Sequence, residues 1–179
     1  MGYARTHVFL QRAIKLELNF CRQVNSSLSA PVIQKFFALV SRLGDGVLWY
    51  ILIPSLPLVY GIDAVDLSIL MIISGLTNIV VYKGLKKLTS RERPCSISAD
   101  IIPGARLLDH YSFPSGHTLH AVGYTLLVLN YYPALGWFLV PFTILVAMSR
   151  VVLGLHYPTD VAAGALIGAL IASLVMNIF

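Results

Sequence analysis

Apolar residues are gathered in four uncharged blocks, and most charged residues lie between them. The blocks cover residues 46–62, 67–82, 118–149 and 161–179. A membrane-spanning helix needs about 20 predominantly apolar residues. The third block is too long for one span, and Asn130–Gly136 supplies a turn in its middle. The pattern predicts five spans, at residues 44–62, 65–85, 116–130, 134–152 and 158–178.

The first 43 residues have a different pattern, because apolar and charged side chains alternate there. Ile14, Leu16 and Leu18 stand among Lys15 and Glu17, and no apolar run reaches the length of a span. We therefore expect neither a span nor a signal peptide in this region. The pattern favours an interfacial amphipathic helix, followed by a second one over 31–43. A helix packed on a soluble neighbour is the alternative.

Composition agrees with a membrane protein. The 179 residues are 57% hydrophobic and 12% charged, about half the charged fraction of soluble domains. We predict an all-α fold, a polytopic helical bundle with five spans, or six if the amino-terminal region also crosses. Residues 1–179 form a single domain, with 1–43 interfacial and 44–179 the transmembrane core. Cys21 and Cys95 have no disulfide or metal-binding spacing.

With five spans, the basic residues fall on one side of the membrane. All 13 Lys and Arg residues lie on or beside the side formed by 1–43, 86–115 and the 152–157 turn. One explanation is topology, since positive charge marks the cytoplasmic face. The other is that some of these cations bind an anion.

Three clusters converge on that side. The first runs from Lys86 to Arg93 after the second span, and the second is Pro114-Ser115-Gly116-His117 before the third. The last comprises Ser149, Arg150, His156 and Asp160 between the final two spans. Singly, such basic residues usually extend to the headgroups, a histidine packs, and an aspartate caps a helix. Ionisable groups gathered at membrane depth from three loops indicate function instead.

The residue types indicate phosphate chemistry. Lys86, Arg93 and Arg150 offer many donors and no acceptor, which suits phosphate oxygens. The backbone N–H groups at Ser115 and Gly116 open a helix and add an anion site. His156 beside Asp160 is an oriented imidazole that could attack phosphorus, and His117 is a second imidazole suited to proton transfer. Because no metal-ligand spacing accompanies them, we predict metal-free phosphoryl transfer without a cofactor.

In residue type, spacing and order, the three clusters resemble the signature of the type-2 phosphatidic acid phosphatase, or lipid phosphate phosphatase, family. The motifs are Lys86–x6–Arg93-Pro94, Pro114-Ser115-Gly116-His117 and Ser149-Arg150–x5–His156–x3–Asp160. The resemblance covers roughly residues 40–179. It implies a membrane lipid phosphatase without metal or cofactor.

The resemblance also implies a role for each site residue. His156 would be the nucleophile that forms a phosphohistidine, oriented by Asp160. His117 would act first as general acid and then as general base. The remaining residues would hold the phosphoryl oxygens: Lys86, Arg93, Ser115, Gly116 and Arg150.

The substrate and the orientation stay open at this stage. Phosphatidylglycerol phosphate, phosphatidic acid and undecaprenyl diphosphate all fit a site that recognises phosphate. A lipid-phosphate binding or transport protein, a lipid-to-lipid phosphotransferase and a haloperoxidase-like protein are the alternatives. We expect a bacterial cytoplasmic (inner) membrane protein with no nucleic acid and no obligate protein partner. The resemblance implies an extracytoplasmic site, whereas the charge pattern implies the cytoplasmic face.

Two smaller features complete the expectations. The connection 95–111 is the longest and could cover the site as a lid, or it could be an inert surface loop. Gly164 and Gly168 permit close approach of two helices, which we interpret as packing within the chain.

Overall fold

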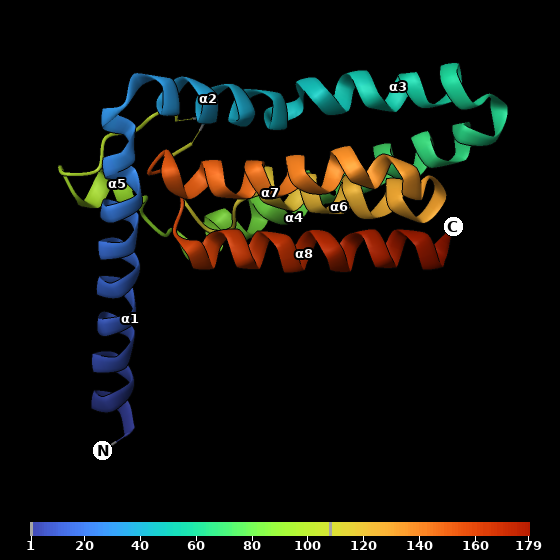
Figure 1. Ribbon diagram of the computed structural model, residues 1–179. Coiled ribbons are helices and arrows are strands. Elements are labelled where there is room, and N and C mark those ends of the chain that lie inside the picture. Colours follow the sequence, from blue (N-terminus) through green and yellow to red (C-terminus); the bar gives the residue numbers. More distant parts are fainter. Residues whose placement is uncertain (1, 108) are drawn as a thin grey trace.

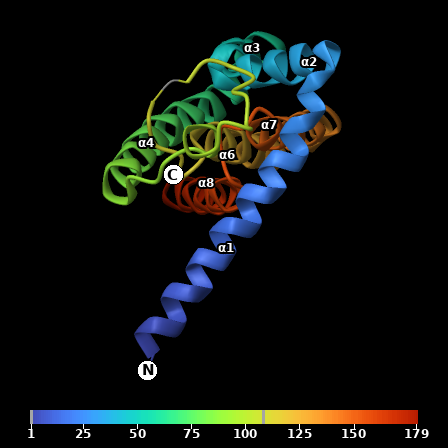
Figure 2. The same cartoon turned by 90° about the vertical axis from the view of Figure 1, so that its left-hand side faces the viewer.

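The computed structural model describes residues 2–107 and 109–179, with side chains from residue 12 on apart from Ala13 and Leu108. Its α-helices are α1 Gly2–Asn25, α2 Pro31–Arg42, α3 Leu48–Tyr60, α4 Val65–Thr89, α5 Pro94–Ile97, α6 Gly116–Tyr131, α7 Gly136–Val152 and α8 Pro158–Ile178. Helices α2 and α3 follow one another along one side of a bundle that contains α4, α6, α7 and α8 (Figure 1). Helix α1 runs across the end of the bundle (Figures 1 and 2).

The predicted helical bundle is confirmed, and each of the five expected spans corresponds to a helix. Within the described residues, four stretches are long and apolar enough to cross a membrane: Pro31–Tyr60, Ile62–Thr89, Pro133–Val152 and Pro158–Ile178. Helix α6 has 16 residues and falls below that length. It packs against α4, α7 and α8.

The boundary between the interfacial region and the first span differs from the expectation. Residues 31–43 were expected to form a second interfacial helix, whereas α2 continues into α3 and the candidate span begins at Pro31. A π-helical turn, Leu43–Val47, carries the chain through the kink, and Gly46 has a φ of 144°. Only glycine adopts this backbone conformation without strain. Helix α2 also packs on α7, where Arg150 donates to the Ser41 hydroxyl.

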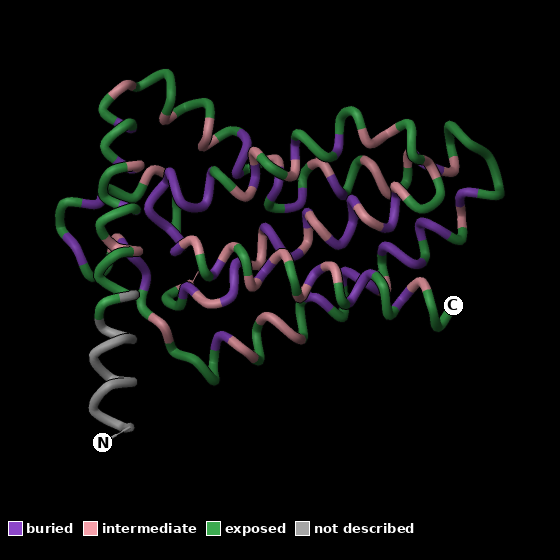
Figure 3. Tube along the Cα trace, turned by 60° about the horizontal axis from the view of Figure 1, so that its bottom comes forward, coloured by how far each residue is buried: buried purple, intermediate pink, exposed green. Residues whose placement is uncertain are grey.

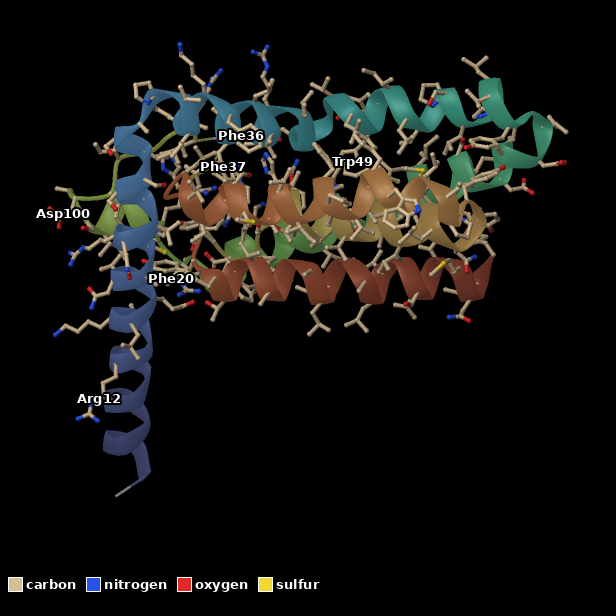
Figure 4. The ribbon with its side chains drawn as sticks, in the orientation of Figure 1. Arg12, Phe20, Phe36, Phe37, Trp49 and Asp100 are labelled. Atoms are coloured by element: carbon tan, nitrogen blue, oxygen red, sulfur yellow. The ribbon has the colours of Figure 1, made fainter. Side chains whose placement is uncertain are left out.

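The main core lies between α3, α4, α6, α7 and α8. Trp49 points from α3 into the bundle (Figure 4), and its ring centroid lies 5.1 Å from that of Tyr124. Buried positions follow the inner sides of the helices, and exposed ones follow the outer sides (Figure 3). Many outward side chains are large and apolar, including Leu58, Val80 and Trp137. Such a surface is typical of helices that face lipid.

Helices α6 and α8 approach closely at two glycines. A Cβ added to Gly164 would lie 2.5 Å from the carbonyl oxygen of Ser115, and one added to Gly168 would lie 2.2 Å from that of Leu119. Both distances are shorter than any normal contact. The expected packing of these glycines within the chain is confirmed. This contact fixes the start of α8 beside the start of α6.

Candidate active site

Backbone hydrogen bonds gather the three sequence clusters at one end of the bundle. The Ser112 N–H donates to the Arg91 carbonyl at 2.8 Å, next to a β-bridge between Glu92 and Tyr111. The Ser115 N–H donates to the carbonyl of Asp160 at 3.0 Å. The first bond joins the first cluster to the second, and the other joins the second to the third. The convergence expected from the sequence is therefore produced largely by main-chain contacts.

A cavity of about 890 Å³ lies at this meeting point. Six of the predicted site residues line it: Lys86, Arg93, Gly116, His117, Arg150 and His156. The three cations among them are almost entirely buried, with 8%, 2% and 4% of Lys86, Arg93 and Arg150 exposed. Burying positive charge is costly unless anions or acceptors surround it. The cavity is therefore built to receive negative charge.

An internal carboxylate already contacts two of these cations. Asp109 Oδ2 accepts a hydrogen bond from Lys86 Nζ at 2.7 Å, and Oδ1 accepts one from the Arg93 guanidinium at 2.7 Å. Burial raises the pKa of Asp109, but the hydrogen bonds and charges of Lys86 and Arg93 outweigh it, so the pKa lies below its usual value. The Asp109 carboxylate thus occupies the position where a phosphate would meet both cations.

Asp109 belongs to the connection 95–111, which the sequence left as either a lid or an inert loop. His110 and Tyr111 from the same connection also line the cavity, and the Tyr111 carbonyl accepts a hydrogen bond from Lys86 Nζ at 3.2 Å. Ile101 is buried, and Gly104 donates its N–H to the Leu153 carbonyl. The connection is part of the cavity wall, and its movement as a lid stays a prediction.

His156 lies on the turn between α7 and α8 with 1% of its surface exposed. Its Nε2 atom is 3.2 Å from the Arg93 guanidinium. A guanidinium can only donate, so Nε2 accepts and the proton of the neutral ring is assigned to Nδ1. Burial, followed by the charges of Arg150, Arg93 and Lys86, holds the pKa of His156 well below its usual range. The imidazole is therefore neutral at physiological pH, with its lone pair on the cavity side.

Asp160 lies behind His156 and is completely buried. Its Oδ2 atom is 3.7 Å from His156 Nδ1, beyond hydrogen-bonding distance, and accepts the Tyr157 N–H at 2.9 Å. Oδ1 accepts a hydrogen bond from Arg91 at 2.6 Å. Asp160 faces the correct nitrogen for its expected orienting role, and the separation must shorten for a direct bond. Such tightening on substrate binding is common in active sites.

His117, at the start of α6, also lines the cavity and has an unexpected partner. Its Nε2 atom lies 3.2 Å from Asp45 Oδ1, and Asp45 stands on the π-helical turn between α2 and α3. A Cβ on neighbouring Gly44 would lie 2.7 Å from Val146, so this turn packs closely against α7. The site thus contains two imidazole–carboxylate pairs, His156 with Asp160 and His117 with Asp45.

Ser115 differs from its expected position. It is fully buried, does not line the cavity, and its hydroxyl lies 2.9 Å from that of Thr118. Because its N–H donates to Asp160, neither of its donors is directed to the cavity in this arrangement. Gly116 does line the cavity. A phosphate-binding role for Ser115 stays a prediction that requires rearrangement of these bonds.

Part of the remaining cavity wall is apolar. Trp49 and Ile53 from α3 face Ile72, Leu76 and Ile79 from α4. Ile72 and Leu76 are at least half exposed on the outer surface, and Ile79 is 37% exposed. The cavity therefore extends from the cationic end along the lipid-facing sides of two spans.

Three polar residues of this region were missed by the sequence interpretation as site residues: Asp45, Arg91 and Asp109. Arg91 stands inside the first cluster, two residues before Arg93, and the pattern gave it no separate role. Asp45 had a local signal, because glycines flank it on both sides directly before an apolar block. Asp109 had none, since only the folded connection brings it to Lys86. In the described part of the chain, no group of three or more His, Cys, Asp or Glu side chains gathers as a metal site.

The fold and these motifs define a helical membrane protein with an anion-binding site, and comparison with known proteins identifies its family. Residues 63–179 match the family model of the PAP2 superfamily. That range holds the three motifs and covers more than half of the chain. The chain belongs to the PAP2 superfamily, and the resemblance to type-2 phosphatidic acid phosphatases is confirmed.

Individual relatives match over shorter lengths. The bacitracin transport permease protein BcrC of Bacillus licheniformis is 40% identical over 39% of this chain and 36% of its own length. Phosphatidylglycerophosphatase B of Haemophilus influenzae is 32% identical over 52% of this chain and 46% of its own. The chain thus spans less than half the length of these curated relatives.

Among solved structures, Aquifex aeolicus LpxE superposes with a TM-score of 0.78. The match covers 90% of this chain and 95% of that one, at 24% identity. At this identity the likeness shows the fold alone. It includes most of the chain, beyond the region that the family model matches.

Proposed function

We propose that this protein hydrolyses the phosphate or diphosphate headgroup of a membrane lipid through a covalent phosphohistidine. One observation carries the proposal: three buried cations and a neutral histidine with its lone pair toward them converge in one cavity. Lys86, Arg93 and Arg150 come from separate elements, and together they would surround the oxygens of a phosphoryl group. The family and its phosphatase relatives support the same reaction class.

In the first step, His156 Nε2 attacks phosphorus and the bond to the lipid oxygen breaks. Arg93 leaves Nε2 and binds a phosphoryl oxygen, which frees the lone pair. The ring becomes positively charged, and Asp160 stabilises that charge through Nδ1. His117 donates a proton to the departing oxygen, so the lipid leaves as a neutral alcohol or as a lipid monophosphate.

In the second step, water attacks phosphorus and the bond to His156 Nε2 breaks. His117, which lost its proton in the first step, accepts one from the water. Inorganic phosphate leaves, and both imidazoles return to their starting states. Asp45 fixes the ring of His117 throughout, and the three cations balance the charge of the transition state.

The apolar wall supports a lipid as the substrate. A phosphate at the cationic end would leave the attached chain beside Trp49, Ile53 and Leu76, between α3 and α4. Contacts of this kind favour a hydrocarbon tail, which each of the candidate lipids carries. Phosphatidylglycerol phosphate, phosphatidic acid and undecaprenyl diphosphate are the substrates to test.

The test is phosphate release by the detergent-purified protein on those three lipids, with excess EDTA. The variant His156→Ala serves as control, and acid-labile, alkali-stable labelling of the protein by ³²P-substrate reports a phosphohistidine. We expect turnover that tolerates the chelator and disappears in the variant. Activity retained by His156→Ala would refute the covalent route.

The alternatives predict other results from the same samples. A binding or transport protein would retain the lipid without phosphate release. A phosphotransferase would transfer the phosphate to an acceptor lipid when one is added and would release little inorganic phosphate. Inhibition by EDTA that Mg²⁺ reverses would show that the reaction needs a metal.

We further propose that the protein resides in a bacterial cytoplasmic membrane with the site on the extracytoplasmic face. Asp100 is exposed beside α5 (Figure 4), so an Asp100→Cys variant lacking the two native cysteines reports that side. Labelling of intact cells by a membrane-impermeant maleimide is expected. Labelling only after lysis would place the site in the cytoplasm.

A further inference from the structure

Helix α1 contacts the segment that carries the site through three side chains spaced four residues apart. Asn25 Nδ2 donates to the Val152 carbonyl at 2.9 Å, and the Cys21 thiol lies 3.9 Å from the His156 carbonyl oxygen. Glu17 Oε1 accepts the Thr159 N–H at 2.9 Å. Residues at this spacing lie on one face of a helix. One face of α1 therefore follows the chain from the end of α7 to the start of α8.

At Glu17 this contact reaches the site through Arg91. The other Glu17 oxygen, Oε2, accepts a hydrogen bond from Arg91 at 2.7 Å. The second arm of the same guanidinium donates to Asp160 Oδ1 at 2.6 Å and to the Thr159 hydroxyl at 2.8 Å. The guanidinium also lies over the Tyr157 ring, 4.0 Å from its centroid. Arg91 is thus held by three contacts with residues 157–160 and by an ion pair with Glu17 of α1.

This arrangement determines how the Asp160 carboxylate is turned. Arg91 binds Oδ1 and the Tyr157 N–H binds Oδ2, so the carboxylate cannot rotate without breaking a charge-assisted bond. In that orientation Oδ2 is the oxygen that faces His156 Nδ1. Exposure is low along the whole chain of contacts, at 16% for the Glu17 side chain, 24% for Arg91 and 0% for Asp160. Buried pairs of this kind are screened less by solvent than surface ion pairs.

We propose that Glu17 and Arg91 are positioning residues for the reaction, acting through Asp160 on the nucleophile His156. The inference rests on the proposed function. It assigns α1, which lies outside the three sequence motifs, a place in the active site. Arg91 sets the orientation of Asp160, and Glu17 holds Arg91 while balancing part of its charge.

The proposal predicts opposite electrostatic effects for the two residues. Arg91→Gln leaves Asp160 uncompensated, which favours the imidazolium of His156 and moves the acidic limb of kcat/KM to higher pH. Glu17→Gln leaves Arg91 uncompensated, which moves the limb to lower pH. The other charged or titratable groups around His156 are unchanged in both variants: Arg93, Arg150, Lys86, His117, Asp109, Tyr157 and Cys21.

The experiment measures kcat, KM and the pH profile of phosphate release for the full-length protein in detergent. We expect kcat to fall about tenfold in Glu17→Gln and more in Arg91→Gln, with KM changed less than threefold, as for misoriented catalytic groups. Arg91→Lys restores the charge but not the two-armed geometry, so it should restore the pH limb and only part of kcat. Asp66→Asn, an exposed carboxylate at the far end of α4, is the matched control.

Three results separate the explanations. Opposite shifts of the limb together with lower kcat support the proposal. The proposal is overturned if both variants keep the wild-type kcat and the wild-type position of the acidic limb of kcat/KM within error, even with a lower melting temperature. In that case α1 has only a structural role. If the wild-type protein releases no phosphate from any lipid of the panel, the proposed function fails instead.

Discussion

Asp45 Oδ1 lies 3.2 Å from Nε2 of His117, so the second imidazole of the site has a carboxylate partner, as the first has. A carboxylate in this position fixes the ring and favours its protonated form. Protonation of the departing oxygen depends on that form. The pair therefore predicts that the effect of replacing Asp45 on kcat depends on how much protonation the leaving group needs.

We expect Asp45→Asn to lower kcat on a lipid phosphate roughly 10- to 100-fold, within the range for general acid catalysis. With an aryl phosphate, whose leaving group needs little protonation, the loss should be several times smaller. The measurement compares kcat on the two substrates, with Asp63→Asn, an exposed carboxylate at the other end of the bundle, as control. Equal losses on both substrates would contradict a role in proton transfer.

Asp109 holds Lys86 and Arg93 at 2.7 Å each, so under the proposed function it would compete with substrate for these two cations. Replacing it with asparagine removes the competing charge. We expect Asp109→Asn to bind inorganic vanadate several-fold more tightly than the wild type, measured as an inhibition constant. Asp100→Asn is the control from the same connection. Weaker inhibition in Asp109→Asn would show that the carboxylate orders the cations rather than competing for them.

The lowered pKa of His156 predicts how stability depends on pH. The unfolded chain takes up a proton on this histidine below about pH 6.5, whereas the folded protein does not. The contribution of His156 to stability is therefore fully present above that pH and is lost as the pH falls below it. The Asp109 contribution is lost only at more acidic pH, since its pKa is below the usual carboxyl value.

Melting temperatures in detergent between pH 5 and pH 7.5 check this prediction. The wild type should lose more stability across the range than His156→Gln, which cannot take up the proton. Parallel curves would contradict the assignment of a neutral, buried imidazole.

The close approach of α6 and α8 predicts strong position dependence for glycine substitutions. A methyl group at Gly168 would meet the Leu119 carbonyl at 2.2 Å, and backbone atoms cannot move aside cheaply. We expect Gly168→Ala to cost about 1–3 kcal/mol, as for overpacked cores. Gly84 on α4 has no atom within 4 Å of an added Cβ, so Gly84→Ala should change stability by about 1 kcal/mol or less. Unfolding in detergent compares the two, and equal effects would contradict the packing argument.

Periodicity and motif spacing predicted the helices and most of the site. Each predicted span corresponds to a helix, because uninterrupted apolar runs between polar turns leave few alternatives. Spacing and topology predicted that Lys86, Arg93, His117, Arg150 and His156 converge on one side of the membrane, and all five line the cavity. Their roles in binding and catalysis stay predictions. These residues lie at helix ends, and helix ends on one side of a membrane are close in space.

The residues that were missed depend on tertiary contacts. Asp109 reaches Lys86 because the connection 95–111 folds against the cavity. Arg91 contacts Asp160 and Glu17 from two other elements at once. The join between α2 and α3 was also missed, since a glycine pair in sequence normally signals an interruption. Here Gly46 lets a helical path continue through a kink.

The cavity is divided between two sets of elements. Its ionic end comes from the termini of α4, α6 and α7 and from the turn before α8, whereas its hydrocarbon wall comes from the middle of α3 and α4. Substitutions at Ile53, Ile72 or Leu76 can therefore alter which lipid tail is accepted while the reacting groups keep their geometry. In a fold organised in this way, substitutions on α3 and α4 can change the lipid that is accepted while the reacting residues stay the same.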